Sequence, residues 1–260
     1  MGKKKIDPKE RVGIISYNLH GYKMVIEDYI TPIDIWVKFT YTNERIHTTW
    51  QSFKARTVRS SYDKTIYGVG YIGIGDYKVT ENGKYTRQYN AWSSMMQRCY
   101  SKAHLKRQSS YIGCKVAEEW HNFQNFAKWY DENYYEANGE RMHLDKDILT
   151  KGNKVYSPET CIFAPHFINC LFIRSRSRRG DLPIGVYFCD KNLINKYGCQ
   201  CSSEFGKQTK LGYYSTPEEA FRVYKTFKEK VIKNIALKYQ QTIPEKLYNA
   251  LIKYEVKIED

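Results

Sequence analysis

The sequence predicts an α+β protein with three parts: a small N-terminal β module, a central helical region ending in a strand–turn–strand–helix unit, and a C-terminal three-stranded sheet packed on one helix. Short runs of alternating apolar and polar residues near both ends predict strands, whereas apolar residues at spacings of three and four in the middle predict helices. The 260 residues have room for up to three small domains. We place these at residues 1–80, 81–173 and 183–260, with a linker at 174–182.

The N-terminal β module is predicted from four runs, each ending near a turn-forming residue. Between Val12 and Phe53 the runs are GIISYN, YKMVIEDYI, DIWVKFTYT and IHTTWQSF, separated at Gly21, Pro32 and Asn43. Residues 68–73, GVGYIG, match the spacing of a dinucleotide-binding fingerprint, but no apolar strand precedes them. We therefore interpret them as a connector and expect no small-molecule cofactor.

The central helices are predicted from apolar residues that repeat at helical spacing and are typical of a packed core. The first helix carries Trp92, Met95, Met96 and Cys99; the second carries Val116, Trp120, Phe123, Ala127 and Tyr130. The basic segment KAHLKRQSSY between them is expected to be a loop.

The end of the central region reads as strand, tight turn, strand and helix: MHLDKDIL, TKGNK, VYSPETCIFA and PHFINCLFIR. Pro165 near the first helical turn suits a helix start. The next segment, IRSRSRRGDLP, is expected to be an extended linker, and its arginines can contact DNA phosphates or stay solvated. These arginines are Arg174, Arg176, Arg178 and Arg179.

The C-terminal part is predicted as three strands, GVYF, KYGCQCS and KLGYYST, followed by one long helix. Thr216 suits the N-cap, Pro217 the first turn, and Glu219 the positive end of the helix dipole. A sheet covered by a single helix leaves its other face open for a ligand.

The charge and the aromatic content indicate the class of partner. There are 42 Lys and Arg against 28 Asp and Glu, a net charge of +14, and the 24 tyrosines offer flat hydrogen-bonding surfaces. Double-stranded DNA is the partner we expect, with a basic protein that binds no nucleic acid as the alternative. No apolar run of about 20 residues is present and the MGKKKIDPKE start lacks a signal-peptide core, so we expect a cytoplasmic protein without a membrane partner. Seven cysteines without a compact pattern indicate reduced thiols.

The segments LDKDIL and GNKVYSPETC, together with Asn169, resemble the HNH, or ββα-metal, endonuclease motif. With WSSMMQRCY and YIGCKVAEEWHNFQNFAKWY the resemblance extends over about residues 85–173, and the nearest likeness is to phage and mobile-element proteins. It implies that Asp145 and Asn169 bind one Mg²⁺ or Mn²⁺ ion, which polarises the scissile phosphate. Structural Zn²⁺ is not expected, because no Cys-x-x-Cys pair exists.

The general base of this predicted site is an open question. The family usually has a histidine after the aspartate, but here that position is Lys146, whose ordinary pKa of about 10.4 makes it a poor base. Either a neighbour substitutes, or Lys146 contacts phosphate, or cleavage is lost. His143 would share a strand face with Asp145, and His166 a helix face with Asn169. Each is a candidate base or metal ligand, or else a surface residue.

The last part, GVYF, KYGCQC and KLGYYSTPEEAFRVY, resembles the DNA-binding domain of the plant ethylene-response-factor (apetala-type) family over residues 183–237. The resemblance implies that the sheet lies in the major groove. Family positions usually held by Arg or Trp are Tyr187, Tyr197 and Lys210 here, so base preference is not transferred. The candidate DNA-binding residues of this part are Tyr187, Tyr197, Gln200, Ser202, Lys207 and Lys210.

Together these patterns predict a homing-type DNA endonuclease of a phage or other mobile element, acting in the cytoplasm of a bacterial host. We expect a monomer, since three dissimilar parts can read an asymmetric site. The main alternative is an inactive DNA-binding protein, a repressor or architectural factor, on an HNH-derived scaffold. RNA binding through the tyrosines is a third possibility.

Overall fold

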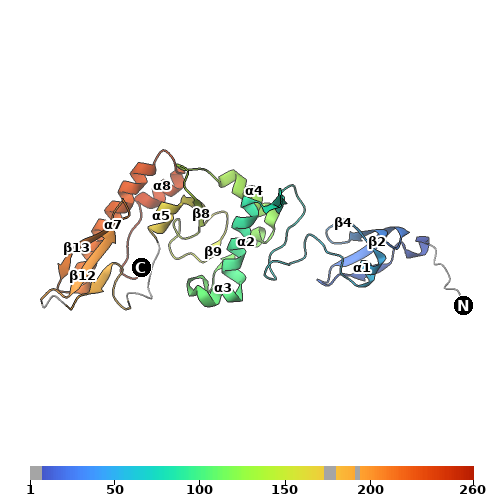
Figure 1. The fold of residues 1–260 in the computed structure, drawn as a ribbon, viewed down its shortest axis with the longest axis horizontal. Coiled ribbons are helices and arrows are strands. Elements are labelled where there is room, and N and C mark those ends of the chain that lie inside the picture. Colours follow the sequence, from blue (N-terminus) through green and yellow to red (C-terminus); the bar gives the residue numbers. More distant parts are fainter. Residues whose placement is uncertain (1–7, 173–179, 191–193) are drawn as a thin grey trace. The chain divides into compact units, whose positions relative to one another are not determined.

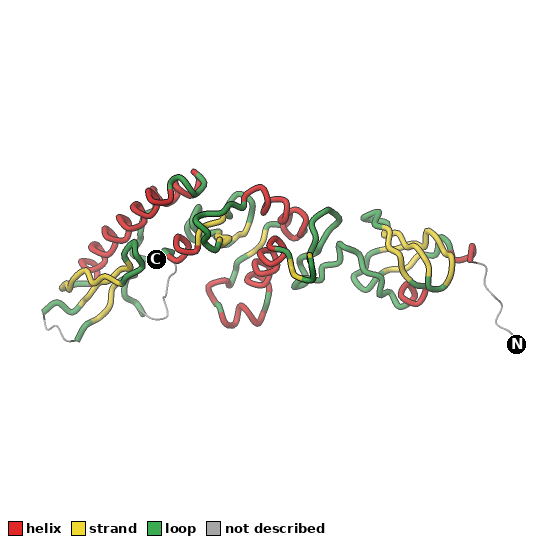
Figure 2. Tube along the Cα trace, turned by 45° about the horizontal axis from the view of Figure 1, so that its top comes forward, coloured by secondary structure: helices red, strands yellow, loops and turns green. Residues whose placement is uncertain are grey.

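The computed structural model describes residues 8–172, 180–190 and 194–260. The fold is α+β, with several small sheets and helices between them (Figures 1 and 2). Contacts divide the chain into two compact units, Met1–Glu132 and Asn133–Asp260. None of the helices in the described part of the chain is long and apolar enough to cross a bilayer.

The first unit begins with an antiparallel meander that confirms the predicted β module. After the short helix η1 (Pro8–Arg11), the strands are neighbours in chain order: β1 (Ile15–Tyr17), β2 (Lys23–Thr31), β3 (Asp34–Phe39) and β4 (Arg45–Thr48). Alternate residues of β3 are buried, as period-two patterning requires. The last predicted run ends instead in a helix, α1 (Trp50–Lys54), because the Thr49 side chain accepts a hydrogen bond from the backbone N–H of Ser52.

The rest of the first unit is mainly helical, with a core of aromatic and apolar side chains. Trp92 and Trp120 are at most 1% exposed, and the Trp92 indole N–H donates to the Trp120 carbonyl oxygen at 2.7 Å. The elements are β5 (Thr80–Glu81), β6 (Lys84–Tyr85), α2 (Arg87–Tyr100), α3 (Lys102–Arg107), η2 (Ser109–Tyr111), β7 (Lys115–Val116), η3 (Glu118–His121) and α4 (Phe123–Asn133).

Two details of this region differ from the sequence-based expectation. The segment after α2 is a helix rather than a loop, because the Ser101 side chain caps α3 by accepting from the His104 N–H. The second predicted helix starts at Phe123 instead of Val116. Val116 and Trp120 are nevertheless buried. Their apolar spacing therefore predicted their burial correctly, although they lie outside the α-helix.

The second unit contains the predicted strand–turn–strand–helix segment and the C-terminal sheet. Its elements are β8 (Met142–Asp145), β9 (Val155–Tyr156), β10 (Ile162–Pro165), α5 (His166–Cys170), β11 (Val186–Phe188), β12 (Tyr197–Ser202), β13 (Gln208–Tyr214), α7 (Pro217–Tyr239) and α8 (Glu245–Ile252). β8 pairs antiparallel with β10, with Asp145 opposite Ile162. The connection is longer than the predicted tight turn, because a turn at Ser157–Thr160 interrupts the second predicted strand.

The C-terminal sheet has the predicted form, with strand order β11-β12-β13 and one long helix on one face. Cys199 and Cys201 of β12 are buried against Ala220 and Tyr224 of α7. The helix starts as expected, with the Thr216 side chain accepting from the Glu219 N–H and Pro217 in the first turn.

One apolar cluster joins the strand–helix segment to the C-terminal helices. Ile162 and Ile168 pack in the same core as Ile235 of α7 and Leu247 of α8. The 23 residues of α7 make a helix of about 35 Å, longer than a three-stranded sheet can cover. Its first half covers the sheet and its second half the β8–β10 pair, so segments that we assigned to separate domains share a core.

Candidate functional site

Asp145 stands at the end of β8, where its carboxylate organises the start of the next loop. Its Oδ1 atom accepts hydrogen bonds from the backbone N–H groups of Asp147 and Ile148, both at 2.7 Å. Burial raises the pKa of the Asp145 carboxyl, and the two backbone hydrogen bonds partly oppose that shift. Within the described residues, Oδ2 accepts no hydrogen bond, so one oxygen remains available for a ligand.

Lys146, which directly follows Asp145, is fixed inside the loop. Its side chain is 7% exposed, and Nζ donates to the Asp147 carboxylate at 2.6 Å and to the Asn153 carbonyl oxygen at 2.8 Å. Nζ also lies 5.7 Å from the centre of the Tyr156 ring. An ammonium held by these acceptors is neither a proton acceptor nor a ready phosphate contact, so Lys146 has a structural role here. Asp147 braces the loop through its contact with Lys146.

His143 and His166 contact each other directly, a relationship that the sequence analysis did not foresee. His143 Nε2 and His166 Nδ1 are 3.1 Å apart, and the ring centres are 4.8 Å apart. Leu144 and Ile168 are buried, whereas His143 is partly exposed and His166 is exposed. Cys170, which was not a candidate, places its Sγ 3.5 Å from His166 Nε2. The i, i+4 spacing of His166 and Cys170 was the signal for this contact.

Asn169 lies on the same face of α5 as His166, three residues further along. His143 and Asp145 likewise share one face of β8, because alternate residues of a strand point the same way. The contact between His143 and His166 therefore brings these two faces together at one point. Among the described residues no group of three or more His, Cys, Asp or Glu side chains can hold a metal ion. The donors that fit a hard cation are the Asp145 carboxylate and the Asn169 amide oxygen.

A second candidate surface is the face of the C-terminal sheet opposite α7. Cross-strand pairing puts Tyr187, Gly198 and Tyr213 in one row, Gln200 beside Lys210, and Ser202 beside Gln208. Burial and the Tyr213 hydroxyl raise the pKa of Tyr187 to about 12. The Ser202 hydroxyl donates to Gln208 Oε1 at 3.3 Å, and Lys207 and Lys210 are exposed. These side chains form the open face, a polar and aromatic surface suited to a nucleic acid.

One predicted contact residue is on the wrong side of the sheet. Tyr197 alternates with Cys199 and Cys201 on β12, and it packs against the apolar cluster that α7 covers. Its prediction as a groove-facing residue was therefore incorrect, because a residue two positions from a helix-facing cysteine faces the helix as well. The four predicted arginines, Arg174, Arg176, Arg178 and Arg179, lie outside the described residues.

Comparisons of the chain with protein-family models, with curated proteins and with solved structures give no match. The assignment of function therefore depends on the residues themselves.

Proposed function

We propose that the protein is a metal-dependent DNA endonuclease, in which the open face of the C-terminal sheet holds duplex DNA and the β8–β10–α5 segment cleaves it. The observation that carries the proposal is the His143–His166 contact, formed two residues before Asp145 on β8 and three residues before Asn169 on α5. The net charge of +14 supports a nucleic-acid partner. A homing-type enzyme of a phage or mobile element in the bacterial cytoplasm agrees with this combination.

Asp145 and Asn169 would hold one Mg²⁺ or Mn²⁺ ion, which supplies Lewis-acid polarisation of the phosphate when bound. The oxygen of Asp145 that accepts no hydrogen bond within the described chain suits this role, and a cation would offset the burial that raises the pKa of this carboxyl.

The histidine pair supplies the proton acceptor that Lys146 cannot provide. A single hydrogen bond between two imidazoles needs one ring nitrogen to donate and the other to accept. The accepting ring uses its unprotonated nitrogen in this contact, so the donating ring, in its neutral form, is the one that keeps a second nitrogen free to take a proton. A neutral imidazole is the usual general base for an attacking water.

The test is incubation of supercoiled plasmid with Mg²⁺ or Mn²⁺. We expect relaxed or linear product from the wild-type protein and none from Asp145→Ala or Asn169→Ala. Asp181→Ala, which removes an exposed carboxylate in the same unit, serves as the control and should cleave normally. Equal cleavage by wild type and Asp145→Ala would contradict the proposed metal site.

DNA binding without cleavage is the second candidate function, and the fixed position of Lys146 favours it. In that case the plasmid stays intact in either metal, whereas duplex DNA binds with steep salt dependence and no need for metal. Competition with a structured RNA in the same assay separates duplex DNA from RNA as the partner. Loss of affinity in Lys210→Ala would assign the binding to the open face.

A further inference from the structure

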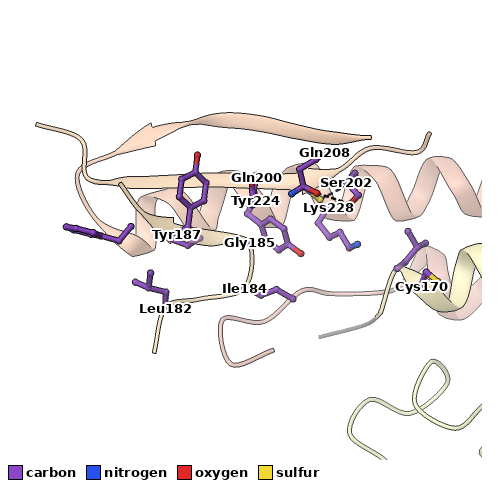
Figure 3. A pocket seen from close by; sticks show the side chains of 14 residues that line it. Cys170, Leu182, Ile184, Gly185, Tyr187, Gln200, Ser202, Gln208, Tyr224 and Lys228 are labelled. Atoms are coloured by element: carbon purple, nitrogen blue, oxygen red, sulfur yellow. Dashed lines mark hydrogen bonds between the residues drawn. The ribbon is translucent and has the colours of Figure 1, made fainter. Parts of the chain in front are cut away.

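A cavity of about 710 Å³ lies beside the start of β11, where β12 continues past Cys199, its last residue paired with β11. This volume is within the range of about 300–1,000 Å³ that is usual for small-molecule sites. Figure 3 shows side chains from both strands and from α7 around the cavity. Its walls combine amide, hydroxyl and aromatic groups, including Tyr187, Gln200, Ser202, Gln208 and Tyr224.

Lys228 extends from α7 into this cavity (Figure 3) and is buried, with no counter-ion among the described residues. It is 9% exposed, and no described residue gives it an ion pair or a hydrogen bond. The stretches of this unit that the structure leaves undescribed, 173–179 and 191–193, contain no acidic residue in the sequence. Burial lowers the pKa of Lys228, and the adjacent Cys201 thiol opposes that shift.

The cost of this arrangement distinguishes Lys228 from the other lysines. A buried ammonium without a partner destabilises a protein, and lysines are almost never fully buried unless they are paired. Lys146 is equally buried but has a carboxylate and a carbonyl as acceptors. Lysines that only cover apolar surface keep their charged end in water, whereas Lys228 directs its side chain inward. A ligand with a negative charge would supply the missing partner.

We propose that this cavity binds a phosphate-bearing ligand of nucleotide size, whose phosphate pairs with Lys228 Nζ. Gln200 and Gln208 add amide N–H donors for phosphate oxygens, and Tyr187 offers an aromatic surface for a base or sugar. The phosphate can come from a free nucleotide or from a nucleotide within a DNA strand on the open face. The proposal does not depend on cleavage by the Asp145 site.

The test uses the full chain and isothermal titration calorimetry with three probes: inorganic phosphate, dTMP and a short DNA duplex. We compare wild type, Lys228→Met and Lys230→Met; the last removes an exposed lysine from the same helix. We expect Lys228→Met to lose about tenfold or more in affinity for dTMP or for the duplex, since hydrogen bonds to charged groups are among the stronger ones. Lys230→Met should bind as wild type does.

The probes also identify the source of the phosphate. A loss confined to dTMP indicates a free nucleotide, and a loss confined to the duplex indicates a strand phosphate; both support the proposal. Equal affinities of Lys228→Met and Lys230→Met for every probe, or no binding of any probe by wild type, would overturn it.

A second measurement covers the case in which Lys228→Met does not fold. Wild-type protein is treated with an amine acetylating reagent, with and without each of the three probes, and modification of Lys228 is measured by mass spectrometry. Protection of Lys228 by dTMP or duplex, with Lys230 modified equally throughout, supports the proposal. Unchanged modification of Lys228 with all three probes contradicts it.

Discussion

The ring of Tyr187 lies across the backbone of Gly198, its cross-strand partner on β12. A Cβ atom built on Gly198 would come within 2.4 Å of the Tyr187 Cζ atom, closer than real contacts allow. Glycine at 198 therefore lets the tyrosine ring cross β12 toward Tyr213, whose ring centre is 6.4 Å away in an edge-on arrangement. The row formed by Tyr187 and Tyr213 on the open face therefore requires a residue without a Cβ atom at position 198.

The first prediction is that Gly198→Ala displaces Tyr187 and weakens DNA binding. Insertion of a methyl group into a filled space costs about 1–3 kcal/mol, so the free energy of unfolding should fall by that amount. Fluorescence anisotropy with labelled duplex and thermal unfolding measure the two effects. Tyr187→Phe, which keeps the ring, is the control for the hydroxyl. Unchanged DNA affinity in Gly198→Ala would show that the tyrosine row is not part of the interface.

The second prediction concerns Lys146, which we expect to matter for stability rather than for chemistry. Lys146→Met leaves the Asp147 carboxylate and the Asn153 carbonyl oxygen without this donor, so the free energy of unfolding should fall by about 1–3 kcal/mol. Asp147→Asn should cost less, because Asp147 is 46% exposed and water can replace the contact. Urea denaturation gives both values. Full stability with lost plasmid cleavage in Lys146→Met would instead make Lys146 a catalytic residue.

The third prediction tests the shared core of the second unit. Ile235→Ala removes a side chain that is 1% exposed, which should cost about 2–5 kcal/mol. Because Ile235 packs in the same cluster as Ile162 and Ile168, hydrogen exchange should accelerate in β8 and β10 as well as in α7. Leu237→Ala, at a 56% exposed position of the same helix, should change little. Exchange that accelerates in α7 alone would show that the strand–helix segment folds independently.

The fourth prediction is a pH dependence of stability caused by Lys228. Burial lowers the pKa of this lysine in the folded state, so protonation of Lys228 favours the unfolded chain. The stability that the protein has with neutral Lys228 is fully present above the unfolded pKa of about 10.4 and is lost as the pH falls through the lower, folded pKa. Lys228→Met should therefore be more stable than wild type at neutral pH. The difference should shrink as the pH rises from the folded pKa toward the unfolded value and should level off above it. Denaturation curves of both proteins across this range give the difference, and a difference independent of pH would contradict the assigned cause.

Local signals in the sequence were sufficient for most of the elements. The alternation in β3, the Thr216 cap and the turn residues of the N-terminal module predicted strands and helix starts that the structure confirms. The resemblance implied a groove-facing Tyr197, but its alternation with Cys199 and Cys201 on β12 puts it on the helix side of the sheet. This alternation is visible in the sequence itself, since alternate residues of a strand face the same way.

Tertiary relationships were beyond local patterns. The contact between His143 and His166 depends on how α5 folds back on β8, and periodicity within either segment carries no information about it. The division of α7 between two cores did have a signal in the sequence. Ile232, Ile235 and Ala236, all buried, continue the apolar stripe of the helix beyond the part that covers the sheet. That no described residue pairs with Lys228 becomes visible only once the surrounding side chains are in place.

The shared core limits how this chain can exchange parts with others during evolution. A recombination joint near residue 174 would separate Ile162 and Ile168 from Ile235 and Leu247, and would leave both products with exposed apolar surface. A joint near residue 133 would transfer the cluster intact. We therefore expect successful natural or engineered chimaeras to inherit the β8–β10–α5 segment and the C-terminal sheet together, as one heritable module.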